Sequence, residues 1–145
     1  MNSQIKKTPF DEILNQLVNT RDWLKNINVK TDSSRFLEVL QYVELIADHY
    51  KNNKVQELLD NYEDEILWWA LLESTAFIDI YKAFNELKDH ELPRRKLAES
   101  LTGPFLSKDE DVAAQNIHSR NILFELQIAA KFHPDGHLDS PTYGH

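Results

Sequence analysis

The spacing of apolar residues predicts that this chain is all-α, an irregular bundle of five to six helices. Apolar side chains recur three and four residues apart along most of the sequence, which is the period of an amphipathic helix. No glycine or proline occurs between Phe10 and Leu92, whereas a β-rich fold needs turn residues about every 8–12 positions. The pattern predicts one helical domain over residues 1–132 and a flexible polar tail over 133–145. The predicted helices cover about 9–26, 33–51, 54–60, 61–89, 93–101 and 108–132.

Two helix starts carry capping signals. Thr8 before Pro9 suits an N-cap residue followed by proline at the first helical position, and Asp11 then lies where the helix dipole favours a negative charge. Asp60 followed by Glu63 resembles an acidic cap, so we expect the fourth helix to begin there.

The segment 61–89 has the widest apolar face, so we expect it to be the central helix. Trp68 and Trp69 are adjacent and point about 100° apart, so both cannot lie on one narrow seam. One of them is a candidate for a partner surface; the alternative is a wide buried face on a central helix. Glu73 and Asp79 interrupt this apolar segment, and their small and polar neighbours favour an outward orientation.

Composition limits the classes of function. The 145 residues carry a net charge of −8, and an acidic surface disfavours direct nucleic-acid binding. The basic cluster at 94–96 is too short to line a nucleic-acid groove. Without cysteine, neither a disulfide framework nor a thiolate zinc site can form. No apolar run is long enough for a membrane span, so we expect a soluble, cytoplasmic protein. We also expect that it uses no cofactor.

The last predicted helix carries an arginine, an asparagine and a glutamate in a mostly apolar segment: Arg120, Asn121 and Glu125. Asn121 falls on the side expected to be buried, so it needs a hydrogen-bond partner there. Arg120 can belong to a satisfied polar patch and reach a carboxylate elsewhere in the fold. The expected buried side consists of Ala113, Ile117, Phe124 and Ile128, with Leu123 and Leu126 beside them.

Residues 119–132, together with 101–105, resemble the helix that precedes the β-core in bacterial proteins of the PD-(D/E)xK, or restriction-endonuclease-like, superfamily. The matching pattern is Arg-Asn-x-x-Phe-Glu-Leu-x-x-Ala. The resemblance implies that Glu125 is an auxiliary acid of a metal site. It also implies that Arg120 and Asn121 orient the helix, with Phe124 as a further motif residue.

The chain departs from that family where catalysis would need it most. Such a nuclease uses an Asp and then a Glu/Asp-x-Lys on a paired strand to hold Mg²⁺. After Glu125 the sequence contains Asp135 and Asp139, and its one lysine is Lys131, inside the predicted helix.

We therefore predict a non-catalytic interaction or regulatory module that binds a protein partner or a downstream domain, as part of a larger or truncated nuclease-like protein. No enzyme activity, catalytic residue or metal ligand is predicted for this chain alone. The alternatives are a metal-dependent nuclease fragment that uses Glu125, and a stand-alone acidic inhibitor or immunity-type protein.

Overall fold

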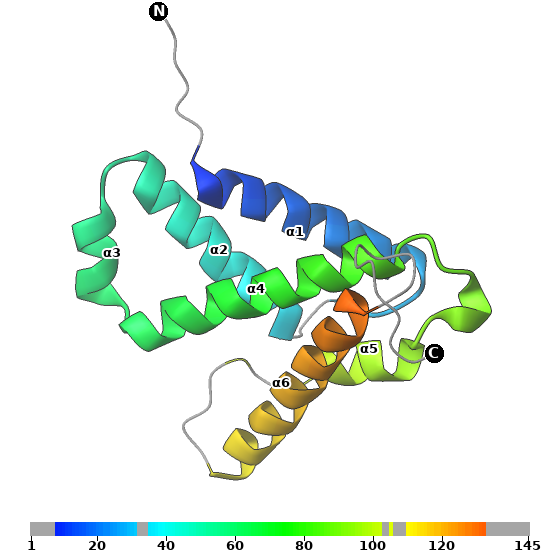
Figure 1. Ribbon diagram of the computed structural model, residues 1–145. Helices are drawn as coiled ribbons and strands as arrows, with labels where there is room; N and C mark the ends of the chain where they lie inside the picture. The colour runs from blue at the N-terminus through cyan, green and yellow to red at the C-terminus, as the bar shows by residue number, and fades with distance from the viewer. Residues whose placement is uncertain (1–7, 32–34, 103–104, 106–109, 133–145) are drawn as a thin grey trace, which may run out of the picture.

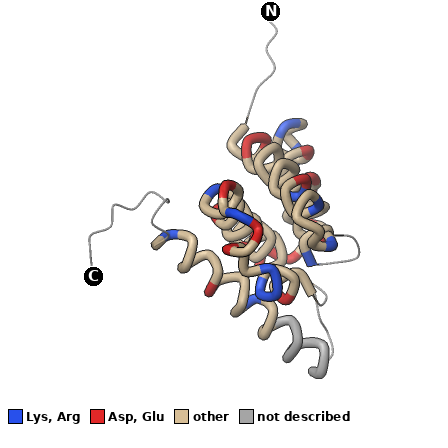
Figure 2. The backbone as a smooth tube through the Cα atoms, turned by 90° about the vertical axis from the view of Figure 1, so that its right-hand side faces the viewer, with Lys and Arg blue, Asp and Glu red and all other residues tan. Residues whose placement is uncertain are grey.

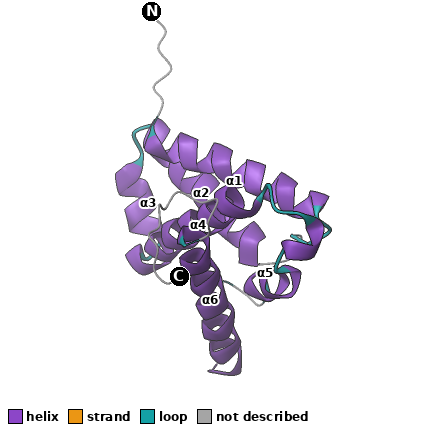
Figure 3. Ribbon diagram, turned by 45° about the vertical axis from the view of Figure 1, so that its right-hand side comes forward, coloured by secondary structure: helices purple, strands orange, loops and turns teal. Residues whose placement is uncertain are grey.

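The computed structural model describes residues 8–31, 35–102, 105 and 110–132, and only the backbone of 110–116. These residues form six α-helices and a short 3-10 helix, with no strand among them (Figure 3). The predicted all-α class is confirmed. The predicted tail at 133–145 lies outside the described residues. No helix in the described ranges is both long and apolar enough to cross a membrane.

The observed helices follow the predicted order. Their bounds are α1 Pro9–Asn26, α2 Arg35–Lys51, α3 Val55–Asn61, α4 Asp64–Phe84, α5 Arg94–Ser100 and α6 Glu110–Lys131, with the 3-10 helix at Asp89–Glu91.

The cap predicted at Asp60 is wrong. Asp60 lies inside α3, and Glu63, the N-cap residue of α4, makes no side-chain capping hydrogen bond. The chain turns instead at Tyr62, which has an extended backbone and packs partly buried against the small core of Ile46, Leu58 and Leu67.

Local chemistry explains where α1 and α2 begin or end. The backbone N–H of Thr8 donates to Asp11 (3.0 Å) and the Asp11 N–H donates to the Thr8 hydroxyl (3.4 Å), a reciprocal capping box that confirms the predicted start. Asn28 follows α1 with φ 65° and Asn53 follows α2 with φ 58°. Asparagine tolerates this left-handed conformation better than most residues, so it ends helices here in a stretch without glycine.

Helix α4 is central, as predicted. It packs against α1, α2 and α6, while α5 packs on α6 and α3 on α2 (Figure 1). At the centre, the rings of Phe36 from α2 and Phe77 from α4 meet edge-on with their centroids 4.9 Å apart. The main core gathers side chains from five helices, including Leu17, Leu24, Val39, Val43, Ala70, Ile80, Leu97 and Leu123.

The prediction for the buried side of α6 is confirmed for Leu123 and Leu126, which are buried, but it is wrong for Ile117 and Ile128, and Phe124 is half-buried. Ile117 and Ile128 are 56% and 59% exposed, and Asn121 is exposed with them, so its amide needs no buried partner. The helix has a second apolar row, and periodicity alone cannot decide between two rows. The row that is buried in the structure consists of Ser119, Ile122, Leu123, Leu126 and Ala130. The side chain of Ala113 lies outside the described residues.

Replacing Phe36 tests the position of the core. Because Phe36 is fully buried against Phe77, we expect Phe36→Ala to lower the free energy of unfolding by about 3–5 kcal/mol. Leu59 is 46% exposed on α3, so Leu59→Ala should change it by less than about 0.5 kcal/mol. Urea denaturation followed by circular dichroism measures both. Similar losses for the two variants would contradict the described core.

Candidate functional site

A buried carboxylate lies at the meeting point of three helices. Glu73 of α4 is fully buried, and its two oxygens accept hydrogen bonds from Nε of Arg35 in α2 and Nε of Arg120 in α6, each at 2.7 Å. The expectation that Glu73 faces outward is therefore wrong. Ala70 and Phe77, three residues before and four after it, are both buried, so Glu73 lies on the core row of α4.

The two arginines have different surroundings. Arg35 is fully buried and also donates from Nη1 to the Thr102 carbonyl at 3.4 Å; its Nη2 has no hydrogen-bond partner among the described residues. Arg120 is 15% exposed, and its guanidinium carbon lies 3.9 Å from the centre of the Trp69 ring. The interpretation that Arg120 reaches a carboxylate elsewhere in the fold is confirmed, and its guanidinium group packs over the Trp69 ring.

Two further polar contacts fix how α6 lies on the rest of the molecule. The Ser119 hydroxyl lies 3.0 Å from the Thr102 hydroxyl, and the Gln127 amide donates to a half-buried Asp79 carboxylate at 2.8 Å. With the Arg120–Glu73 pair between them, these contacts set the rotation of α6 about its own axis. The arrangement can orient a helix, and it uses the arginine of the family-like motif to do so.

The other motif residues lie apart from that buried pair. Glu125 is exposed and its carboxylate lies 3.5 Å from Nζ of Lys96 on α5. Phe124 is half-buried, with its ring centre 6.3 Å from that of Trp69. Within the described residues, no three His, Asp or Glu side chains are grouped so that they could hold a metal ion.

The two adjacent tryptophans have separate environments. Trp68 is 62% exposed, whereas Trp69 is half-buried beneath Arg120. Leu72, one turn after Trp68, is 37% exposed, and Asp64 and Glu65 lie exposed one turn before it. We call the apolar pair Trp68 and Leu72, with these two acids, the Trp68 surface.

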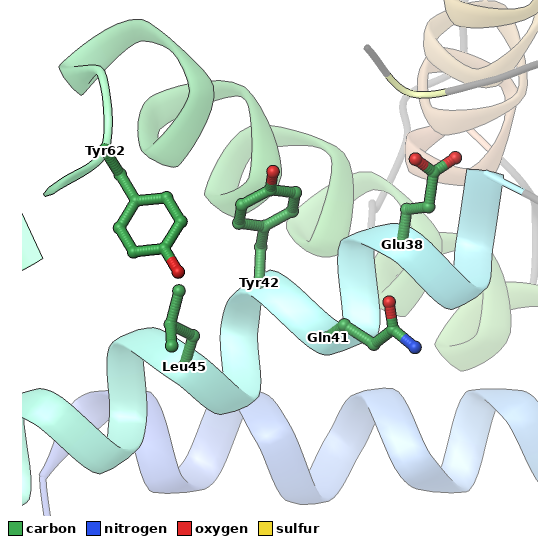
Figure 4. Close-up of a pocket in the computed structure, with 5 residues that line it drawn as sticks. All are labelled: Glu38, Gln41, Tyr42, Leu45 and Tyr62. Carbon is green, nitrogen blue, oxygen red and sulfur yellow. The ribbon is translucent and has the colours of Figure 1, made fainter.

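An open cleft of about 320 Å³ lies between α2 and the turn that joins α3 to α4. Its lining residues are Glu38, Gln41, Tyr42, Leu45 and Tyr62 (Figure 4). The rings of Tyr42 and Tyr62 stand nearly perpendicular, at 89°, with centroids 6.2 Å apart. Burial raises the pKa of the Tyr42 phenol above 10.0, and the neighbouring Glu38 and Tyr62 raise it further.

A partly buried hydrogen bond to the backbone holds one edge of this cleft. The Glu38 Oε2 accepts a hydrogen bond from the backbone N–H of Phe105 at 3.0 Å, and the Phe105 ring centre lies 5.6 Å from that of Tyr42. Residue 105 belongs to the segment before α6 that the resemblance included. Sequence reasoning missed the cleft, although Glu38 and Tyr42 are spaced four apart and so lie on one side of α2.

Comparisons with protein-family models, with curated proteins and with solved structures found no match to this chain.

The Glu73 ion pairs can be tested with two isosteric substitutions on the same helix. Glu73→Gln leaves two arginines without their carboxylate, so we expect a loss of about 3–5 kcal/mol in the free energy of unfolding. Asp79→Asn keeps an acceptor for Gln127 at a half-buried position and should cost less than about 1 kcal/mol. Chemical denaturation measures both. A Glu73→Gln variant as stable as Asp79→Asn would show that the buried carboxylate is not needed.

Proposed function

We propose that this chain is a non-catalytic helical interaction module that binds a protein partner through the Trp68 surface. The partner is a separate protein or a domain of a longer nuclease-like protein, as the resemblance to the PD-(D/E)xK superfamily implies. One observation carries the proposal: a tryptophan that α4 holds largely in solvent beside an exposed leucine.

The exposure of Trp68 supports a binding role because this residue type is seldom left uncovered. Tryptophan offers a large, rigid apolar area with one hydrogen-bond donor, and it is enriched among the residues that dominate binding energies. The fold does not need Trp68 for its core, since Trp69 supplies the aromatic contact with Phe124 and Arg120. A partner can therefore bury Trp68 and Leu72 without disturbing the core.

Charge indicates what kind of partner fits. Asp64 and Glu65 flank the apolar pair at the start of α4, and the whole chain carries a net charge of −8. Figure 2 shows Lys and Arg positions interspersed with Asp and Glu positions along the backbone of the coloured helices. An apolar hollow with basic residues at its rim complements the Trp68 surface, and such a pairing weakens as salt rises.

The two charged residues of the family-like motif, Arg120 and Glu125, both form ion pairs within the fold, which is compatible with a non-catalytic module. Arg120 is bound to Glu73 and Glu125 is paired with Lys96. We keep the role of Glu125 as an auxiliary acid as the less supported alternative, because no other acid of the described residues joins it in a metal-binding group.

A photo-crosslinking residue can locate the partner. We expect p-benzoyl-phenylalanine at position 68 to give a discrete crosslinked product in the organism that encodes this chain. The same residue at Lys82, which is exposed farther along α4, should give none. Mass spectrometry identifies the product. Equal labelling from both positions would contradict a specific surface.

With the purified partner or domain, Trp68→Ala should weaken binding by about 30-fold or more, the size expected for a dominant anchor. Its unfolding free energy should stay close to that of the parent, because the side chain is exposed. Isothermal titration calorimetry at rising NaCl should show a steep salt dependence that Asp64→Asn with Glu65→Gln reduces. Unchanged affinity in Trp68→Ala would overturn the proposal.

A direct assay separates this proposal from the nuclease alternative. We expect the purified chain to leave plasmid DNA uncut in Mg²⁺ or Mn²⁺, because Glu125 lies exposed beside Lys96 without grouped acids. Gel electrophoresis measures cleavage. Metal-dependent cleavage that disappears in Glu125→Ala but persists in a control, Glu86→Ala, would establish the alternative instead.

A further inference from the structure

The cleft beside α2 combines aromatic faces with a carboxylate. Glu38 and Tyr42 lie one turn apart on α2 and project to the same side of it, and Tyr62 extends from the α3–α4 turn toward Tyr42 and Leu45 (Figure 4). The perpendicular rings of Tyr42 and Tyr62 form two walls of one corner, and Leu45 closes it with an apolar side chain.

This lining distinguishes between classes of ligand. The face of an aromatic ring carries partial negative charge and attracts cations, most strongly where water is excluded. Glu38 is the one acidic or basic residue among the five lining residues, so it supplies the formal charge of the cleft. A phosphate or carboxylate ligand would be repelled by Glu38. A wholly apolar ligand would bury Glu38 and Gln41 without new hydrogen bonds.

Size narrows the class further. A volume of about 320 Å³ is at the lower limit of ligand pockets, which are roughly 300–1,000 Å³. A cleft of this size fits a cationic head group with a few carbons better than it fits a large cofactor.

We propose that the cleft formed by Glu38, Gln41, Tyr42, Leu45 and Tyr62 binds an alkylammonium group, with the two tyrosine rings against its methyl or methylene groups and the Glu38 carboxylate facing its charge. The site is separate from the Trp68 surface and goes beyond the proposed interaction function. The ammonium group can come from a free amine of the choline type or from a lysine side chain of a protein, free or methylated.

The decisive probe pair is choline and its uncharged isostere, 3,3-dimethylbutan-1-ol. We expect choline to shift the ring proton resonances of Tyr42 and Tyr62 saturably in nuclear magnetic resonance titrations, and the isostere to bind at least about tenfold more weakly. Glu38→Gln should weaken choline binding about tenfold, since it removes the charge while its oxygen can still accept from Phe105. Glu44→Gln, an exposed acid elsewhere on the same helix, is the matched control and should bind like the parent.

Further experiments distinguish a free amine from a protein lysine as the source of the ammonium group, and they test the cleft independently of the Trp68 surface. A peptide with trimethyl-lysine that binds more tightly than choline indicates a protein ligand, and the reverse order indicates a free amine. Tyr62→Leu should abolish binding, whereas Tyr42→Phe, which keeps the ring, should retain it; circular dichroism checks that both fold.

The Trp68→Ala variant should bind choline as the parent does, so a failure of the proposal for the Trp68 surface would leave this result unchanged. Equal binding of choline and its isostere, equal effects of Glu38→Gln and Glu44→Gln, or no saturation by about 10 mM would overturn the proposal.

Discussion

The contact on which this fold depends is the pairing of Glu73 with two arginines, one at each carboxylate oxygen. Removing a carboxylate from water is costly unless opposite charges and hydrogen bonds replace its hydration, so Glu73 is compatible with the core only when Arg35 and Arg120 are both in place. Since the three residues come from α2, α4 and α6, one buried group constrains the mutual placement of three helices. The apolar contacts around it are less directional and tolerate other arrangements more readily.

What the sequence predicts well in this chain is local. The capping box of Thr8 and Asp11 involves residues three apart, and the turn at Asn28 depends on the backbone preference of one residue, so both can be read from short segments. The helices of a glycine-free and proline-free stretch follow from periodicity for the same reason. The start of α4 was misplaced because the turn at Tyr62 depends on packing against α2, and the N-cap residue Glu63 makes no side-chain capping hydrogen bond.

The sequence does not predict the features that depend on contacts between helices. Glu73 was expected to face outward because Ser74 and Thr75 follow it, yet Ala70 and Phe77, one turn away on either side, mark it as a core position. On α6 two apolar rows compete, and the ion pair of Arg120 with Glu73 selects the row that is buried. The sequence left open whether one of the two adjacent tryptophans is exposed or both belong to a wide buried face, and it did not single out Trp68. The cleft beside α2 was missed because one of its walls is Tyr62. The position of Tyr62 depends on the turn after α3 and not on the spacing of residues along α2.

The separation of the partners of Glu73 along the chain has a consequence for biosynthesis. Arg35 precedes Glu73 by 38 residues and Arg120 follows it by 47, so a nascent chain acquires the first cation long before the second. Helices α1 to α4 can associate while α6 is still inside the ribosome, but one oxygen of that carboxylate then lacks its arginine. A product that terminates prematurely, upstream of Arg120, would retain this defect and be an easier substrate for cellular proteases than the finished protein.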